Sequence, residues 1–511
     1  MESMTAEEFL KISADFRLGE LDTEKPHPLT EKLSDLAKVD LEAAFRLLKK
    51  IDISALSRMR AATEQLEDLS RNIHDCLSSG GRIYLAGCGA TGRLSLALES
   101  FGRQGMLPEE WRNRVIGFMA GGDAALIRSI EGFEDIPDYG VRQLKELGFG
   151  QNDLLIASTE GGETPWVIGV TEAAAHWSSR KPWFCYCNRD DVLRPLVERS
   201  RRVLENRGIE KICLATGPMA LAGSTRMQAS TVLMLGIGLA LLQAAYPGQS
   251  SLTKSLNAFT AYFDTLAFES LAPVTLEEEK ASRKGDQTHY STDSFGLTVL
   301  TDTTERSPTF SLSPFENELS PSDKACLCYL KIKNTDHSEA AWGNILRRQP
   351  RCLEWENSVN FTGSKWLQGY PIHDTHGSSS ALNIDIGFAG EHLEIISSTD
   401  IEIRFPSSIA FAQENPAAML FDNVALKCLL NAHSTLLMGR LGRYEGNLMT
   451  YVRASNFKLI DRAIRYIQIL AHRQTGETLT YKRTCEALFS VKDCIQPWEP
   501  IVLKTIKDLN L

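Results

Sequence analysis

The chain has 511 residues, too many for one ordinary hydrophobic core, so its length predicts two large domains. Hydrophobic residues make up 43% and charged residues 23% of the chain, a globular composition that argues against disorder. The formal net charge of -10 argues against a nucleic-acid partner, which favours a basic face, but a turn at a helix N-terminus still lets an acidic protein bind a small anion.

The eleven cysteines follow no pattern typical of a metal site, because no CxxC pair accompanies a second CxxC or an HxxxH. His373, Asp374 and His376 lie in a polar loop, where such groupings are usually solvated. The longest apolar run, around Val232 to Leu242, is too short for a membrane span and predicts a buried helix. Since the acidic N-terminus shows no secretory signal, we expect a cytoplasmic protein with reduced thiols, no cofactor, no metal and no membrane contact.

Helical spacing of apolar residues extends from Glu7 to Ser79 and ends at two glycines. Five short apolar runs then alternate with helical stretches, which predicts a parallel sheet covered on both faces. These strand candidates are residues 82–86, 115–120, 154–158, 183–187 and 212–215.

The pattern then repeats in a diverged form. A helical stretch from about Leu252 to Lys284 precedes a second strand set, and a long helical tail begins at Met419. The strand candidates of this half are residues 296–300, 325–332, 381–386, 393–398 and 401–405. We therefore predict a duplicated α/β domain, with a first copy over residues 1–265 and a diverged copy over 266–511.

Three polar turns with glycines follow strands of the first half. The first is Gly87-Cys88-Gly89-Ala90-Thr91-Gly92-Arg93, in a strand–turn–helix arrangement that presents backbone N–H groups and a positive helix end to a phosphate. The second turn covers residues 158–165 and the third covers 217–226. All three are expected at the carboxyl ends of the strands, where open α/β sheets bind ligands. The predicted ligand-binding residues are Gly87, Gly89, Ala90, Thr91, Gly92, Thr159, Ser224 and Thr225.

Other interpretations of these turns stay open. A glycine turn can simply pack a helix on a sheet, and Ser224 and Thr225 can cap the helix that follows them. Nucleotide binding is disfavoured, because the lysine of a phosphate-binding P-loop is missing after the glycines and the spacing does not fit the dinucleotide-binding pattern.

The residues of these turns resemble one family in particular. The motif Gly-x-Gly-x-Thr-Gly-Arg-Leu at 87–94, the stretch 120–135, the motif at 222–227 and the tail at 444–463 are similar to N-acetylmuramic acid 6-phosphate etherases and to glucokinase regulatory proteins. The resemblance implies two SIS (sugar isomerase) domains, each flavodoxin-like with a parallel sheet and flanking helices. It also implies a phosphorylated amino sugar or hexose as the ligand. The regulatory proteins fuse two such domains, as the length here suggests, and use a C-terminal helical lid to bind a sugar kinase; we expect most of that lid to be absent.

The resemblance further implies a pair of catalytic glutamates. Removing an ether substituent by elimination needs a base for a carbon-bound proton and an acid for the leaving oxygen. Glu131 matches one glutamate through the run Ile130-Glu131-Gly132-Phe133-Glu134-Asp135. At the position of the other, the first half has Phe101, whereas the second half supplies Glu305 within Asp302-x-x-Glu305-x-x-Pro-Thr-Phe310. One composite site is therefore expected from Glu131, Glu305 and the turns of the first half.

The structural alternatives are that Glu131 and Glu134 are solvated charges at a helix start and that Glu305 forms an ion pair with Arg306 or Arg93. Three departures from the family pattern, Met219, Gln228 and Gly161, weaken a purely catalytic interpretation. Three functions remain: an etherase-like lyase, a sugar-phosphate-sensing regulator of a partner such as a sugar kinase, and a sugar-phosphate isomerase. The family resemblance favours a phosphosugar-binding protein that has etherase activity or senses its ligand.

Overall fold

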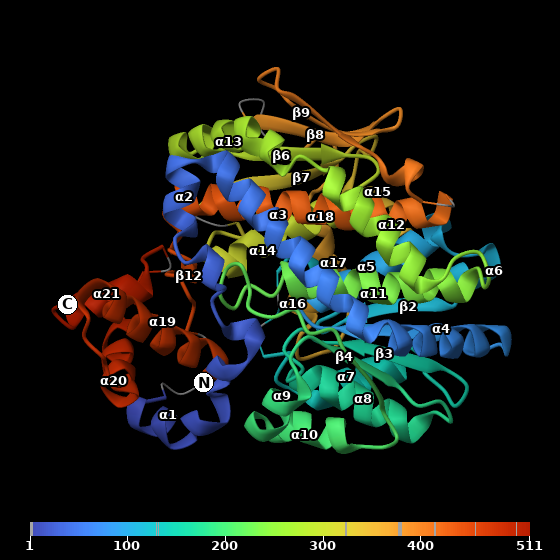
Figure 1. Ribbon diagram of the computed structural model, residues 1–511, viewed down its shortest axis with the longest axis horizontal. Helices are drawn as coiled ribbons and strands as arrows, with labels where there is room; N and C mark the ends of the chain where they lie inside the picture. The colour runs from blue at the N-terminus through green and yellow to red at the C-terminus, as the bar shows by residue number, and fades with distance from the viewer. Residues whose placement is uncertain are drawn as a thin grey trace.

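Two five-stranded sheets organise the molecule, and helices fill the space between them (Figure 1). The computed structural model describes residues 4–128, 130, 132–321, 324–376, 381–412, 415–454, 456–496 and 498–511. Glu131, one of the predicted catalytic residues, lies outside the described residues.

The first sheet is entirely parallel, with the strand order β2-β1-β3-β4-β5. This is the flavodoxin-like order that the family resemblance implies. The register aligns Gly87 of β1 with Met119 of β2 and Ser158 of β3, so the turns after these strands lie at one edge. The five strands are β1 Ile83–Gly87, β2 Val115–Met119, β3 Leu154–Ser158, β4 Trp183–Tyr186 and β5 Glu210–Cys213.

The side chains of alternate residues in these strands pack into two separate hydrophobic cores. Ile83 and Leu85 belong to a large core that continues into the second half, whereas Tyr84 and Ala86 belong to a core beneath α7 and α8. Both faces are therefore covered, as predicted. The helices of this half are α4 Thr63–Ser78, α5 Ala90–Phe101, α6 Glu109–Arg112, α7 Pro137–Glu146, α8 Pro165–Trp177, α9 Asp190–Leu196, α10 Glu198–Glu205 and α11 Gln228–Ala245, with short helical turns at Met59–Ala62, Gly102–Met106 and Asp123–Leu126.

The second sheet keeps a parallel centre and adds antiparallel strands, in the order β10-β9-β8-β6-β7. β6 pairs in parallel with β7 and β8, while β8, β9 and β10 form an antiparallel meander. The connection at Gly390, where φ is +60°, is too short for a parallel crossover, which explains the change of direction. The α/β class with parallel sheets is thus confirmed, with this extension in the second half. The strands are β6 Thr288–Thr292, β7 Cys328–Ile332, β8 Leu382–Ala389, β9 His392–Ser397 and β10 Glu402–Pro406.

The prediction of a strand at residues 296–300 is wrong, because these residues begin helix α14 (Gly296–Phe310). The strand of this region is the preceding β6, a buried but polar Thr-His-Tyr-Ser-Thr run. A short apolar run in a buried helix has the same sequence pattern as a buried strand, and periodicity alone does not separate them. Helix α12 (Leu252–Thr265) ends the first half. The other helices of the second half are α13 Ala272–Lys284, α15 Ser338–Leu346, α16 Val359–Thr362, α17 Ser364–Gln368 and α18 Asn415–Arg440, with helical turns at Phe268–Leu271 and Ser408–Ala410.

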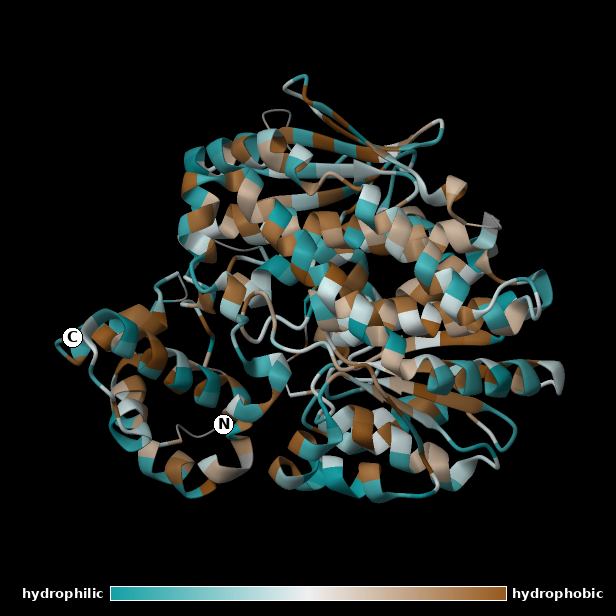
Figure 2. Ribbon diagram, in the orientation of Figure 1, coloured by the Kyte–Doolittle hydropathy of each residue, from teal (hydrophilic) through white to brown (hydrophobic). Residues whose placement is uncertain are grey.

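The halves pack side by side through their helices. α5 and α11 of the first half contact α14 and α18 of the second. In Figure 2 the hydrophobic colour gathers along these central helices, and one continuous core spans both halves. Among the described residues, α11 is the one helix long and apolar enough for a membrane span, but 89% of that window is buried inside the protein. It is therefore a core helix, as its sequence predicted.

The two ends of the chain lie together on one side of the molecule (Figure 1). The tail helices α19 Phe457–Thr475, α20 Tyr481–Lys492 and α21 Ile501–Asp508 pack on one another, and α20 contacts α1 (Ala6–Ile12). A small hairpin, β11 Tyr444–Glu445 with β12 Leu448–Met449, precedes them. Helices α2 (Leu33–Val39) and α3 (Leu41–Arg58) contact α18, so the N-terminal lead-in also touches the second half. Four short helical turns complete the N-terminal region, at Ser13–Phe16, Leu18–Glu20, Asp22–Glu24 and Pro28–Thr30.

Candidate functional site

The first glycine turn joins β1 to the N-terminus of α5. Gly89 has φ +54°, a left-handed conformation that favours glycine, and a Cβ on Gly87 would lie 2.3 Å from the backbone carbon of Thr91. The buried Thr91 hydroxyl accepts the Cys88 N–H and donates to the Cys88 carbonyl, both at 3.0 Å. Thr91 therefore holds the turn closed in this structure, and its contact with a ligand stays a prediction.

The second turn lies beside the first, because β3 neighbours β1. Thr159 is buried; its hydroxyl accepts the Gly162 N–H at 3.3 Å and lies 3.0 Å from the Thr164 hydroxyl. Next to it, the buried carboxyl of Glu160 accepts a hydrogen bond from Ser230 at 3.0 Å. Burial is the main cause that raises the pKa of Glu160 to about 7, and the nearby Glu305 contributes. Sequence analysis did not single out Glu160.

Glu160→Gln is expected to change the pH dependence of stability. Because the pKa of Glu160 is raised from 4.5 to about 7, its stabilising effect is complete below pH 4.5 and is lost as the pH rises through 7. The loss amounts to about 3 kcal/mol, so the variant should be more stable than the native protein by about that amount above pH 7 and equal to it below pH 4.5. Urea unfolding at pH 4.5 and 7.5 measures the difference.

The matched control for this experiment is Glu172→Gln on α8, whose partly exposed carboxylate pairs with Arg202. A Glu160→Gln stability curve parallel to that of the native protein would contradict the assigned pKa.

The third turn leads towards α11 and lies against the tail helix α19. A Cβ on Gly223 would lie 2.8 Å from the Arg462 guanidinium carbon. The Ser224 hydroxyl is buried and has no hydrogen-bond partner among the described residues. The helix-cap alternative is wrong for Ser224 and Thr225, because α11 starts after Met227 and no side chain caps it.

Glu305 on α14 reaches the first half at the helix that follows the glycine turn. It is buried, and one of its carboxyl oxygens lies 3.7 Å from the Arg93 guanidinium. Its other oxygen and the Arg93 Nε have no hydrogen-bond partner among the described residues. Burial is the largest influence on Glu305 and raises its pKa, although Arg93 opposes the shift. Of the two ion-pair alternatives, the Arg93 pair is present.

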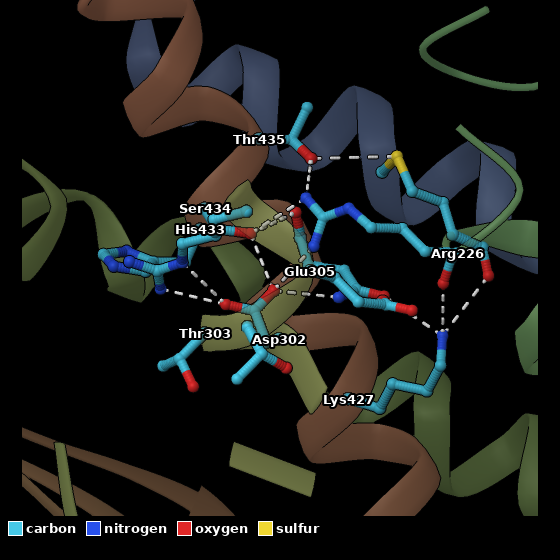
Figure 3. A network of polar contacts seen from close by, with 12 residues as sticks. Arg226, Asp302, Thr303, Glu305, Lys427, His433, Ser434 and Thr435 are labelled. Carbon is cyan, nitrogen blue, oxygen red and sulfur yellow. Dashed lines mark hydrogen bonds and ion pairs between the residues drawn. The ribbon is translucent and has the colours of Figure 1, made fainter. Parts of the chain in front are cut away.

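Arg306 is instead part of a buried polar network between α14 and α18. Figure 3 shows Asp302, Ser434 and Arg226 of this network. Arg306 donates to Asp302 and Glu278, while Arg226 donates to the other oxygen of Asp302 at 2.9 Å. Ser434 and Asn431 also donate to Asp302. Burial raises the pKa of Asp302, but Arg306 and Arg226 outweigh it and hold the value at about 2. This network joins the third turn of the first half to the core of the second.

A cavity of about 20 Å³ lies between the halves beside Glu305. A volume of this size holds about one water molecule, far less than a sugar ring. Its lining residues are Ala90, Arg93, Leu94, Ala97, Ser230 and Met234 from the first half, and Thr298, Thr301, Glu305 and Lys427 from the second. Glu305 and Ala90 of the glycine turn thus line the same cavity.

Glu134 is a further acid at this edge, present in the family motif but not assigned a role from sequence. One of its carboxyl oxygens lies 3.8 Å from the Cys88 Sγ, and the other accepts from the Asn456 side chain at 3.4 Å. Burial is the main cause that raises the pKa of Glu134, and the carboxylates of Asp135 and Glu163 raise it further. The geometry therefore puts a carboxyl with a raised pKa beside the glycine turn.

The tail supplies a lysine to the same edge. Lys458, at the start of α19, contacts Glu163 of the second turn and lies 4.0 Å from Glu24. Glu163 also accepts from Arg199 at 2.7 Å, and burial opposes but does not overcome the lowering of its pKa by these cations. More than 290 residues separate Lys458 from Glu163, so only the resemblance of the tail motif pointed to this segment.

Two other sequence features lie away from the turns. The buried Glu99, two residues before Phe101 on α5, contacts Arg103, Arg348 and Arg351 and so has a structural role. No group of three metal-binding side chains is found among the described residues.

The fold and these turns define an α/β protein with a candidate site at the carboxyl edge of a parallel sheet, next to a second, diverged half. The family description "Glucokinase regulatory protein N-terminal SIS domain" matches residues 64–175. An N-acetylmuramic acid 6-phosphate etherase of Synechocystis sp. is 32% identical over 226 residues, which cover 43% of this chain and 67% of the relative. The same-named protein of Bacillus cytotoxicus is 30% identical, covering 43% of this chain and 73% of the relative. The chain therefore belongs to the N-acetylmuramic acid 6-phosphate etherase family.

Some relatives are covered less completely; the chain spans 64% of the etherase of Synechococcus elongatus, at 32% identity. Among solved structures, the tagatose-6-phosphate ketose/aldose isomerase of Escherichia coli aligns with a TM-score of 0.34 and 11% identity, covering 56% of this chain and 67% of that one. The C-terminal domain of glucosamine-fructose-6-phosphate aminotransferase from Francisella tularensis aligns with a TM-score of 0.34 and 8% identity, covering 75% and 96%.

Proposed function

We propose that this protein binds a sugar phosphate at the carboxyl edge of the first sheet and cleaves an ether in it, as the name of its etherase relatives describes for N-acetylmuramic acid 6-phosphate. The phosphate meets the turns at Gly87, Gly89, Ala90, Thr91 and Gly92, together with Thr159, Ser224 and Thr225. The compact turn at α5 supports this assignment, since its backbone N–H groups and positive helix end suit an anion.

In the proposed substrate, D-lactate is the group joined to the sugar by the ether. A carboxylate removes the proton from the carbon next to the sugar carbonyl, and the ether bond breaks as a carbon–carbon double bond forms. A carboxylic acid protonates the oxygen of the departing lactate. Water then adds to the resulting double bond. Glu131 and Glu305 are the proposed pair, and Glu305 suits the acid because burial raises its pKa and so favours the protonated carboxyl. Glu134 is a third acid or base candidate, because it lies beside the glycine turn.

One observation carries the proposal. Glu305 belongs to the second half, yet it lies 3.7 Å from Arg93 on the helix that begins at the glycine turn of the first half. The test is incubation with N-acetylmuramic acid 6-phosphate and assay of released D-lactate. Exchanging Glu131 and Glu134 for glutamine, one at a time, identifies which of them moves the proton. Absence of lactate release under all conditions would remove the lyase function.

Thr91→Val is expected to weaken sugar-phosphate binding. The change keeps the shape but removes a hydroxyl, at an expected cost of about 1.5–3 kcal/mol of affinity if it contacts the charged phosphate. Titration calorimetry with sugar 6-phosphates measures the loss. Thr171→Val is the matched control, because its buried hydroxyl donates to the Val167 carbonyl within α8. Unchanged affinity of Thr91→Val for every sugar tested would remove Thr91 from the site.

A regulatory protein without turnover is the second candidate. The match of residues 64–175 to the glucokinase regulatory protein domain favours it. The ion pairs of Glu163 with Lys458 and Arg199 at the edge of the site also favour it, because these two cations are then already neutralised by a side chain. This candidate implies a cytoplasmic protein whose affinity for a sugar kinase changes with sugar phosphate. A regulator would bind the sugar phosphate without releasing lactate, and the bound sugar would change how strongly the protein inhibits such a kinase. A lyase would release lactate, and an isomerase would convert the sugar phosphate into its isomer.

A further inference from the structure

A segment of the second half, residues 347–355, lies against the first sheet at its edge strand β2. We call it the crossing segment. The backbone of Arg351 exchanges two hydrogen bonds with Asp123, and its guanidinium donates to Glu99 and to the carbonyl of Gly117 on β2. Arg348 also donates to Glu99, at 3.0 Å, and to Asp123. These charges are largely buried and mutually paired, so the segment is fixed on the first half.

The crossing segment ends at Trp355, which is 3% exposed and enclosed by residues of the first half. Its ring stacks on Phe133 with centroids 5.9 Å apart and planes at 17°, and it meets Tyr139 edge-on at 5.5 Å. The Arg142 guanidinium lies 4.1 Å from its ring centroid, and its indole N–H donates to Glu146 at 2.8 Å. These contacts hold the crossing segment and the first-half residues around Phe133 and Tyr139 together.

Phe133 is the residue next to Glu134 in the chain. The Glu134 carboxyl lies at the glycine turn, and the Glu134 carbonyl accepts the Trp166 N–H at 3.0 Å. Gly132 precedes Phe133 and has φ +82°, a conformation that favours glycine. Because glycine has no side chain, Gly132 adds no side-chain contact that would hold the loop in place. The buried ring of Phe133 therefore anchors the loop directly beside Glu134, and Trp355 is the ring stacked on it.

We infer that Trp355 is a positioning residue, which reaches from the second half to hold the loop of Glu134 against the glycine turn. The inference rests on the proposed function for its catalytic consequence, but its structural part stands apart from it. The second half then contributes two side chains to the site of the first half. Glu305 lines the cavity, and Trp355 supports the loop of Glu134 from outside it. Trp355 is not among the described residues that line the cavity at Glu305.

The test compares Trp355→Ala and Trp355→Phe in the full-length protein. Hydrogen exchange is followed in peptides that cover Phe133 to Tyr139, with peptides of β3 and α8 as internal references. Trp355→Ala should speed exchange of the loop by about tenfold or more, because it removes the stack, the cation contact and the indole hydrogen bond. Trp355→Phe keeps a ring and should stay within about threefold of the native protein. Trp366→Ala is the matched control, since Trp366 contacts Phe361 and Tyr370 instead of the loop.

The lactate assay supplies the second readout. Trp355→Ala should lower kcat while leaving KM within about threefold, and Trp355→Phe should restore it, because the loop carries a proposed proton-transfer group and not the phosphate contacts. If Trp355→Ala does not fold, Arg142→Ala must still speed loop exchange, because it removes both the cation over the ring and the ion pair that holds Glu146 beside the indole. Exchange that is unchanged, or that rises equally in the reference peptides, overturns the inference. Local loosening without any lactate release in the native protein would support the positioning role and count against the lyase function alone.

Discussion

Glu305→Gln is expected to reduce lactate release by about 10²- to 10⁴-fold while ligand affinity changes little. The amide keeps the shape of the side chain, but it has no carboxyl proton to give to the leaving oxygen. Burial raises the pKa of Glu305 and so favours the protonated carboxyl that this step needs. Single-turnover lactate release and calorimetric affinity, measured on the same preparation, separate the chemical step from binding.

Glu316→Gln is the matched control for this change, because Glu316 is a half-buried glutamate of the same half whose contacts are with Gln287 and Cys326. It should leave turnover and affinity unchanged. Turnover of Glu305→Gln within threefold of the native rate would exclude Glu305 as the acid. If the protein only binds its ligand, the same variant should alter affinity and there will be no turnover to lose.

Asp302→Asn is expected to cause the largest loss of stability of any change considered, about 3–5 kcal/mol. Asp302 accepts from Arg226 and Arg306 inside the core, where both cations are buried (Figure 3). The amide removes the negative charge that pairs with the buried Arg226, and it leaves Arg306 paired with Glu278 but no longer with Asp302. Urea unfolding at neutral pH, with the midpoint and slope compared with the native protein, measures the effect.

Lys333→Ala is the control for this experiment, because Lys333 and Asp385 form an exposed pair on the second sheet with side chains 37% and 48% exposed. It should cost less than about 1 kcal/mol. A loss below 1 kcal/mol for Asp302→Asn would mean that the network of Figure 3 contributes little to the packing of the two halves.

The first half was predictable in detail because its strands have strong local signals. Apolar runs next to glycine turns located β1 and β3 within one residue of their observed bounds. The second half was less predictable, because β6 is a buried strand made of polar residues and α14 opens with an apolar run that resembles a strand. Their identity depends on burial between neighbouring elements, which no local pattern records.

The sequence by itself determined the fold class, the three turns after the strands of the first sheet and the second-half motif that carries Glu305, because each is a property of adjacent residues. Only the tertiary structure decided which distant groups meet: Glu305 with Arg93, Lys458 with Glu163, and Trp355 with Phe133. The physical reason is that these contacts arise from the packing of the halves and the tail, over sequence separations that spacing and periodicity do not encode. The same packing buries Glu160 and Glu305 and thereby raises their pKa. Burial of this kind depends on neighbours distant in the chain, so the sequence around each glutamate does not reveal it.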